Sequence, residues 1–467
     1  MVRPLQELMD IAGREMPGDD ELIIEPGDDV YKTSVPLEDT ITDILAGIGL
    51  MASDLWEQRH GSRQQVLVPR RHAAVALRSF MLLGGKAMQG EAGYGAMLKR
   101  RQGARVNITR MFPDKDGRWI HLHGGFPKLQ QRTLEFLGCG DDEKAIEKKI
   151  SGLSAFVLEE EMNGAGLCAA VARSEEEWLS HAQGRALLEV PVVEVLKIGD
   201  SPAEPACRGP RPLAGVRCLD LTRVLAGPVC GRTLAAHGAT VMRVNAGHVP
   251  VIPPFLMDTA HGKRSTLIDL GEDGGREKML AMVREADIFT EGYRPGTMER
   301  FGLSPRELAE QRPGIICTSI SCYGHNGPWR ERAGWEQMAQ TATGMAVLQG
   351  GMPSPAIMHD CAPTDYSTGY LAAYGTMVAL RRRAREGGSY HVRVSLCRTA
   401  MFYLQQLRRE KQVRAPSGEE LRAACGTVQT DYGELTHLLP AERLSETNPR
   451  YDNGPLPLGV DAPVWPS

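Results

Sequence analysis

From residue 213 onward, short apolar runs alternate with longer stretches in which apolar residues recur at helical spacing. The short runs predict strands, and the longer stretches predict helices. Alternation of this kind favours parallel strands joined by right-handed crossovers, and hence an α/β fold with a Rossmann-like doubly wound parallel sheet. Strands are expected at 215–221, 240–244, 265–270, 287–291 and 314–321, with helices at 228–238, 275–286 and 304–311.

The chain also contains a repeat at a spacing of 326 residues. Over the 36 aligned pairs from Asp39/Asp365 to Ala74/Ala400, 11 residues are identical and no gap is needed. Both copies predict a helix, a turn containing glycine and a strand with valines at alternate positions. Residues 1–84 are therefore predicted to be a partial first copy, in which Asp39 takes the place of Asp365.

A different block lies between the copies. Residues 85–198 predict a smaller α+β domain, with a hairpin at 110–125 and a helix at 128–138 that ends at a glycine. A further helix at 173–184 has Ser174 as its expected N-cap.

The remaining boundaries follow from composition. Residues 199–212 are rich in proline and glycine and predict a linker. Residues 213–410 then form the expected Rossmann-like domain, and 411–467 form a C-terminal extension that returns to it.

Overall composition limits the classes of function. The chain has 467 residues, of which 42% are hydrophobic and 24% charged, and its net charge is −4. No basic excess indicates a nucleic-acid partner, and no 18-residue apolar run predicts a membrane span. Ten cysteines without a C-x-x-C pair indicate reduced thiols, and no metal site is expected. We expect a cytoplasmic protein without a recognisable targeting segment.

Candidate ligand-binding residues lie next to the predicted strands, where open α/β sheets bind their ligands. No G-x-G-x-x-G follows the first strand, so a dinucleotide cofactor is not indicated. A small Ala-Gly-Pro turn opens the first helix, where free amides suit an anion. An aromatic ring and guanidinium groups suit an adenine and phosphates, although the same residues are equally typical of solvated basic loops. The side chains concerned are Lys263, Arg264, Tyr293, Arg294 and Arg300.

Asp365 opens the apolar helix of the second copy and is predicted to be its N-cap. Most aspartates in this place only cap a helix. Trp335 and Glu336 stand just before another helix, which bears small residues. His325 is a possible general base, but a single histidine in a glycine-rich turn is more often a surface group.

Several segments together resemble the class III CoA-transferases (the CaiB/BaiF type), a family that includes formyl-CoA transferase, carnitine CoA-transferase and α-methylacyl-CoA racemase. They are "GVRCLDLTRVLAGPVCGRTLAAHGATVMRV", "GKRSTLIDL", "ADIFTEGYRPGTMERFGL", "ISCYGHNGPW" and "DYSTGYLAAYGTMVALRRRAREG". The resemblance covers residues 213–410 closely and 426–467 more loosely. It implies that Asp365 is a nucleophile that forms an acyl anhydride and then an aspartyl-CoA thioester.

The resemblance also implies how coenzyme A is held. Ala226 matches a backbone contact beside the thioester, and Tyr293, Thr297 and Arg300 match positions that hold adenine and phosphates. The predicted CoA-binding residues are therefore Arg223, Ala226, Lys263, Arg264, Tyr293, Arg294, Thr297 and Arg300.

Four positions show where the chain agrees with the transferases and where it departs. Arg223 and Leu225 stand where formyl-CoA transferase has a histidine and a glutamine. Glu336 matches a glutamate near the nucleophile of the transferases. Trp335 stands where the racemases have a catalytic histidine, and because indole cannot act as a base, this counts against racemisation.

The expected activity is transfer of CoA from an acyl-CoA to a small carboxylic acid, with Asp365 and Glu336 as catalytic residues and no permanently bound cofactor. An acyl-CoA racemase or isomerase of the same fold and a non-catalytic CoA-binding remnant remain the alternatives. Asp39 is expected to be a cap or a remnant, because 38 preceding residues cannot build a CoA-binding sheet. The chain is expected to be a homodimer or a pseudo-dimer within one chain.

Overall fold

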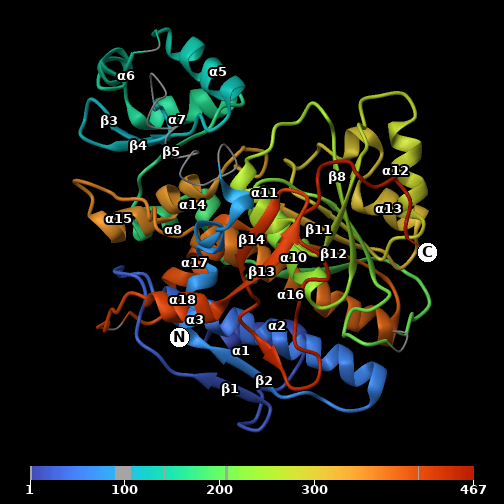
Figure 1. Cartoon of the computed structure of the whole chain (residues 1–467). Helices are drawn as coiled ribbons and strands as arrows, with labels where there is room; N and C mark the ends of the chain where they lie inside the picture. Colours follow the sequence, from blue (N-terminus) through green and yellow to red (C-terminus); the bar gives the residue numbers. More distant parts are fainter. Residues whose placement is uncertain (1–2, 90–106, 141, 206–208, 409, 467) are drawn as a thin grey trace.

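The computed structural model describes residues 3–89, 107–140, 142–205, 209–408 and 410–466. Parts of the predicted small domain (90–106 and 141) and of the predicted linker (206–208) therefore lie outside the described residues. Figure 1 shows the first-copy elements (blue) at the lower side of the large unit and a smaller α+β unit at the top.

The large sheet has seven strands in the order β6-β12-β11-β10-β7-β8-β9. All neighbouring pairs are parallel except β12 with β6, which is antiparallel. This confirms the predicted parallel α/β fold. The strands are β6 (Glu194–Gly199), β7 (Arg217–Leu221), β8 (Thr240–Asn245), β9 (Lys263–Leu267), β10 (Ile288–Glu291), β11 (Ile316–Ser321) and β12 (Ser389–Ser395).

Alternate residues of these strands face two different cores, as the pleat of a doubly covered sheet requires. Cys218 and Ile288 belong to one cluster, with α10 (Ala226–Ala236) and α16 (Pro363–Glu386). Leu219 belongs to the other cluster, with α12 (Gly275–Val283) and α13 (Pro305–Gln311). Helices therefore cover both faces, and α10 and α16 pack together on one of them.

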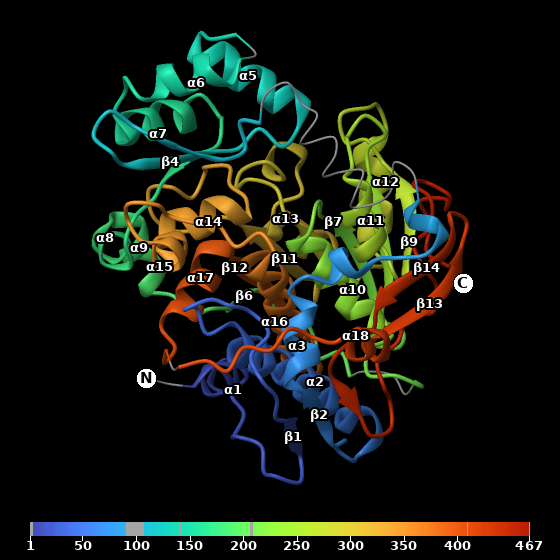
Figure 2. The ribbon, with the colours of Figure 1, turned by 60° about the vertical axis from the view of Figure 1, so that its left-hand side comes forward.

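The first copy has the same element order as the second. Helix α2 (Leu37–His60), strand β2 and helix α3 (Arg70–Ala76) correspond to α16, β12 and α17 (Leu396–Leu404). Helices α2 and α16 have 24 residues each and pack against each other. They lie side by side in both views (Figures 1 and 2).

A three-stranded sheet, β1-β2-β15, repeats the edge β11-β12-β6 of the large sheet. Its strands are β1 (Leu22–Glu25), β2 (Val66–Pro69) and β15 (Arg443–Leu444). Val66 of β2 pairs with Leu22 in parallel and with Leu444 in antiparallel orientation. Val392, 326 positions later, pairs with Thr318 in parallel and Val195 in antiparallel orientation. Strands β2 and β12 therefore have neighbours that run in the same relative directions on both sides.

The smaller unit contains a three-stranded antiparallel sheet, β3-β4-β5, with its own hydrophobic cluster. The predicted hairpin is present, and Gly117 supplies a positive φ of 79° in its turn. The predicted helix is α5, which ends at Gly138 in the left-handed region. The elements are β3 (Met111–Pro113), β4 (Trp119–Leu122), α5 (Pro127–Leu137), α6 (Glu143–Ile150), α7 (Ala155–Gly164) and β5 (Ala169–Val171).

Two predicted elements differ from the structure. The single helix expected at 173–184 is two helices, α8 (Glu175–Ser180) and α9 (Ala182–Leu188), because His181 adopts an extended conformation between them. Ser174 is the N-cap of α8, as predicted, in a full capping box. The strand expected at 265–270 begins two residues earlier and ends at Leu267.

The other described elements are short. Helices α1 (Pro4–Ala12) and α18 (Gly418–Ala424) flank the first copy, and the hairpin of β13 (Cys425–Thr430) and β14 (Gly433–Leu438) precedes β15. Helices α11 (Pro253–Thr259), α14 (Glu336–Thr343) and α15 (Met345–Gly350) complete the large unit. Within the described ranges, no helix has the length and apolar character of a bilayer span.

Candidate active site

Asp365 lies in the first turn of α16, not at its N-cap. Helix α16 begins at Pro363 and its N-cap is Ala362, so Asp365 is the third helical residue. The N-cap prediction is therefore wrong. The reason is that a proline in the first helical position is favourable, and it moves the helix start two residues ahead of Asp365.

Glu336 takes over the capping function from a different helix. Its Oε2 accepts the backbone N–H of Asp365 at 2.5 Å and the hydroxyl of Thr364 at 2.7 Å. Its Oε1 accepts the backbone N–H of Thr364 at 3.2 Å and the side-chain amide of Gln340 at 2.7 Å. A buried carboxylate with four donors satisfies the free amides at the start of α16 and fixes the backbone of Asp365.

Both carboxyl groups have a raised pKa. Burial raises the pKa of Asp365 well above its usual value, and the charge of Glu336 raises it further. Burial also raises the pKa of Glu336, although its hydrogen bonds oppose that shift. The site therefore holds Asp365 as an unusually basic carboxyl group, which is a property of catalytic nucleophiles and bases.

The start of α10 comes close to the same turn of α16. Gly369 lies one helical turn after Asp365, and a Cβ at Gly369 would lie 2.2 Å from the carbonyl oxygen of Ala226. Glycine thus permits a backbone approach that places the first residue of α10 beside the Asp365 face of α16. The structure brings Ala226 and Asp365 to the same part of the molecule.

The loop before α10 contains a strained residue. Val224 has φ 69°, and within the described ranges it is the one non-glycine residue with positive φ. A β-branched side chain disfavours this conformation, and such residues concentrate at functional sites. Val224 lines a cavity together with its neighbour Arg223.

That cavity, of about 430 Å³, lies between the smaller α+β unit and the carboxyl ends of β7, β10 and β11. It brings together three of the predicted residues, Arg223, Tyr293 and Arg294. Trp335, which also lines it, stacks on His123 with ring centroids 5.0 Å apart, and Phe126 lies 5.5 Å from the same ring. Trp335 directly precedes Glu336 in the chain, although neither Glu336 nor Asp365 itself lines the cavity.

Other predicted binding residues lie elsewhere. Lys263 is buried, and its Nζ donates to Asp220 Oδ2 and to the carbonyl of Pro228, each at 2.7 Å. Because its ammonium is enclosed by the fold, the structure gives Lys263 a packing role and contradicts the expectation that it contacts a phosphate. Arg264 pairs with Asp461 at 2.9 Å on the edge strand β9.

The loop after β10 carries the remaining predicted residues. The backbone N–H of Thr297 donates to the carbonyl of Arg294, which forms a tight turn, and Arg300 is exposed in a short 3₁₀ helix. Neither Thr297 nor Arg300 lines the cavity. Glu291 Oε2 accepts the N–H of Tyr293 at 2.8 Å, and burial raises the Glu291 pKa to about 7.

His325 is not placed as a base for this site. Its ring lies 5.8 Å from that of His391 in a T-shaped contact, and burial lowers its pKa to about 4. His325 lines a separate, small cavity with Glu291 and His391. No group of three or more metal-binding side chains is arranged around a metal site in the part of the chain that the structure describes.

The first copy contributes residues that sequence patterns did not indicate. The carbonyl of Leu77 accepts the N–H of Ala362, just before α16. The N–H of Phe80 donates to the hydroxyl of Tyr366 at 2.9 Å, and that hydroxyl donates to Asp258 Oδ2 at 2.8 Å. These contacts join residues 286 and 108 positions apart, so no local signal in the sequence could have revealed them.

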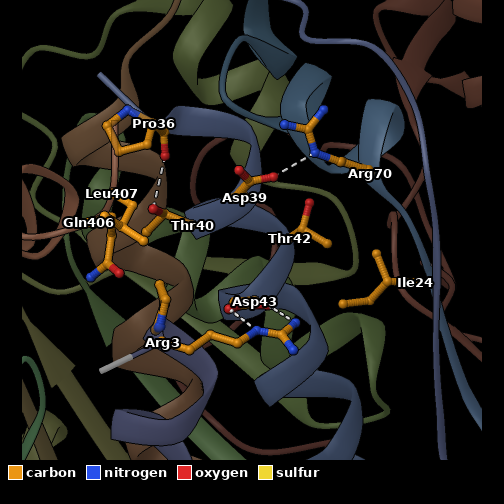
Figure 3. Close-up of a pocket in the computed structure, with 11 residues that line it drawn as sticks. Arg3, Ile24, Pro36, Asp39, Thr40, Thr42, Asp43, Arg70, Gln406 and Leu407 are labelled. Atoms are coloured by element: carbon orange, nitrogen blue, oxygen red, sulfur yellow. Dashed lines mark hydrogen bonds and ion pairs between the residues drawn. The ribbon is translucent and has the colours of Figure 1, made fainter. Parts of the chain in front are cut away.

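Asp39 lies at the equivalent place of α2, beside a cavity of about 400 Å³ (Figure 3). Like Asp365, it is the third helical residue rather than a cap. Its Oδ1 pairs with Nε of Arg70 at 2.7 Å, whereas Asp365 has a second carboxylate beside it. Asp39 thus has a cationic neighbour where Asp365 has an anionic one, so the two sites have opposite electrostatics.

Comparison with known proteins finds a family match over just under half of the chain. Residues 213–442 match the sequence profile described as CoA-transferase family III. The chain is 33% identical over 321 residues to "acetyl-coenzyme A transferase nodX" of Hypoxylon pulicicidum, covering 62% of this chain and 53% of that protein. It is 32% identical over 208 residues to a probable fatty acyl-CoA transferase of Mycobacterium tuberculosis, covering 41% and 52%.

A third relative is the succinyl-CoA–D-citramalate CoA-transferase of Chloroflexus aurantiacus. The identity is 31% over 225 residues, which covers 44% of this chain and 54% of that protein. The chain thus spans about half the length of the curated relatives that it matches.

Proposed function

Because residues 213–442 belong to CoA-transferase family III, we propose that this chain transfers CoA from an acyl-CoA to a carboxylic acid, with Asp365 as the nucleophile. The observation that carries the proposal is the contact between Glu336 and the first turn of α16. This contact fixes the partly exposed carboxylate of Asp365, whose pKa is raised, near a cavity that is large enough for a small-molecule ligand. The relatives named acyl-CoA or succinyl-CoA–D-citramalate CoA-transferases support the same class of donor and acceptor.

The proposed chemistry is a sequence of acyl transfers. The ionised carboxylate of Asp365 attacks the thioester carbonyl, the C–S bond breaks, and an aspartyl anhydride and CoA thiolate form. The thiolate attacks the aspartyl carbonyl, which forms an aspartyl-CoA thioester and releases the donor's carboxylate. The acceptor's carboxylate then attacks this thioester, and the returning thiolate takes the new acyl group and frees Asp365.

Glu336 acts in this scheme as a positioning residue. It binds the backbone of Asp365 rather than a substrate, and its charge makes Asp365 more basic. A more basic carboxylate is the stronger nucleophile once it is ionised. The start of α10 at Ala226 presents backbone amides near the same turn, where they can donate to the developing oxyanion.

The CoA moiety is proposed to lie in the cavity beside Arg223, Tyr293 and Arg294. The Tyr293 ring offers an aromatic surface for the adenine, and the guanidinium groups offer donors for phosphates. The apolar wall at Trp335 and Phe126 excludes water from the anhydride, which would otherwise hydrolyse.

We also propose that the first copy is a non-catalytic partner in a pseudo-dimer within one chain. Strand β6 follows the first copy in the chain but pairs with the second, and β15 follows the second copy but pairs with the first. Such reciprocal exchange is typical of an interlocked pair of related units. The Asp39–Arg70 pair leaves one nucleophile, Asp365, which the first copy supports through Leu77 and Phe80.

The test is a transfer assay in D₂O with a panel of acyl-CoA donors and carboxylic acids. The proposal predicts formation of a new acyl-CoA without deuterium at the α-carbon of recovered donor. Deuterium incorporation without transfer would instead establish a racemase or isomerase, for which Trp335 offers no base. If no pair of donor and acid gives a new acyl-CoA or a deuterated donor, the result would support a CoA-binding remnant.

A further inference from the structure

The charged side chains that line this cavity are all cationic. Five cationic side chains line it, and no carboxylate does. Arg332 is paired with Glu160, but within the described ranges no ion pair is formed by any of the other four. The four are Lys128, Arg132, Arg223 and Arg294.

Two of these cations come from the smaller unit. Lys128 and Arg132 are exposed, and as residues i and i+4 of α5 they share one face of the helix. Nη2 of Arg132 donates to the carbonyl of Ala165 at 2.7 Å, which fixes the guanidinium at the turn after α7. Within the described ranges, the other donors of this guanidinium have no hydrogen-bond partner, so they can bind a ligand.

Arg132 meets Arg294 of the large unit across this turn. The Cβ position of Gly166 lies 3.7 Å from Nη2 of Arg132 and 3.7 Å from Nη1 of Arg294. Two guanidinium groups held so close repel each other in the absence of an acid, and a bound anion removes that cost. Gly166 has φ 71° and no side chain, so the space between the two groups stays open.

We propose that Lys128 and Arg132 of α5 bind the phosphate groups of the CoA thioester together with Arg294, so that the smaller unit forms one side of the CoA site. This rests on the proposed function for the identity of the ligand. A CoA thioester carries a pyrophosphate and a 3′-phosphate, and cations on two opposite elements match several phosphates better than the single carboxylate of a small acid.

The test is equilibrium binding to the full chain, without turnover. The ligands are CoA, adenosine 3′,5′-bisphosphate and pantetheine, of which the last has no phosphate. Binding is compared between the parent chain, the double variant Lys128→Gln/Arg132→Gln and the matched variant Lys144→Gln/Lys148→Gln. Lys144 and Lys148 are exposed on α6 of the same unit and do not line the cavity.

We expect the Lys128/Arg132 variant to bind CoA and the bisphosphate about tenfold or more weakly, with a shallower dependence on salt. Pantetheine affinity should be unchanged, and the Lys144/Lys148 variant should match the parent. Equal affinity of parent and variant for CoA, absence of CoA binding by the parent, or an equal loss for pantetheine would overturn the inference. Because no transfer is needed, a chain that binds CoA in this way but transfers none would overturn the proposed function alone.

Discussion

Oε2 of Glu336 accepts the backbone N–H of Asp365, so one carboxylate caps the helix on which the other is placed. The contact joins α14 to α16 and brings two acidic groups together at a helix start. Positive helix-end potential and four hydrogen bonds stabilise Glu336, whereas Asp365 is left with burial and a negative neighbour. This asymmetry supports our proposal that Asp365 is the nucleophile and Glu336 a positioning residue.

Replacing Glu336 by Gln removes a negative charge beside Asp365 and keeps an oxygen acceptor. The pKa of Asp365 should fall, and the acidic limb of the pH–rate profile should therefore move to lower pH. The plateau value of kcat should also fall, because a less basic carboxylate is a weaker nucleophile. An unmoved acidic limb in the Glu336→Gln profile would show that the two groups are not coupled.

Replacing Asp365 by Asn should separate activity from stability. Removing the nucleophile should reduce kcat by about a thousandfold or more. The folded state raises the pKa of Asp365, so ionising it costs folding free energy above its unfolded pKa of about 3.8. Asp365→Asn should therefore have a higher Tm than the parent at pH 8, and the difference should vanish as pH falls to about 4.

Thermal unfolding of parent and variant at both pH values shows directly whether Asp365→Asn raises Tm. Asp39→Asn is the matched control, since Asp39 pairs with Arg70 and its loss should lower Tm or leave it unchanged. Turnover by the Asp39 variant should stay within about twofold of the parent. A large loss of turnover in the Asp39→Asn variant would indicate a second catalytic site at Asp39.

The hydroxyl of Tyr366 links the first copy to the candidate site. Tyr366→Phe leaves the N–H of Phe80 and a carboxylate oxygen of Asp258 without this partner, which should cost about 1–3 kcal/mol of stability. Because Tyr366 follows Asp365, kcat should fall as well. Tyr374→Phe on the same helix removes a buried bond to the carbonyl of Leu8 and should reduce stability without reducing kcat.

A buried histidine should make the fold sensitive to acid. His261 is buried and makes a tilted contact with His437, with ring centroids 4.0 Å apart. Neither ring nitrogen of His261 has a hydrogen-bond partner among the residues that the structure describes. Burial lowers its pKa well below 6.5. The folded state thus favours neutral His261, and its contribution to stability is lost as pH falls below the unfolded pKa of about 6.5.

Urea unfolding at pH 7.5 and pH 5 tests this expectation. The parent should lose more unfolding free energy between these pH values than His261→Leu does. Equal losses would assign the acid sensitivity to other groups, such as His72, whose pKa burial lowers to about 4.

Sequence patterns were sufficient for the parallel sheet, because its strands are apolar runs separated by amphipathic helices. The repeat from Asp39 to Ala74 also predicted the correspondence of α2 with α16. The exchanged strands were not predictable: β15 has two residues, and β6 leaves Leu196 exposed, so neither has a distinctive pattern. Their places depend on long-range pairing rather than on local sequence.

The candidate site was likewise predictable from the sequence only in part. Asp365 and Glu336 were identified through the family resemblance, but the hydrogen bond between them connects residues 29 positions apart and required the fold. Lys263 was misassigned because its position next to a strand suggested exposure, whereas its side chain is turned inward to Asp220. The proposed role of Arg132 had no signal in the sequence, because Arg132 belongs to a different unit from Arg294.

The most direct measurement is trapping of the activated aspartate. The chain is incubated with acyl-CoA donors, treated with hydroxylamine, and the peptides containing Asp365 and Asp39 are examined by mass spectrometry. The account predicts a hydroxamate on Asp365 that depends on acyl-CoA, and none on Asp39. A chain that binds CoA but forms no hydroxamate on Asp365 with any donor would contradict it.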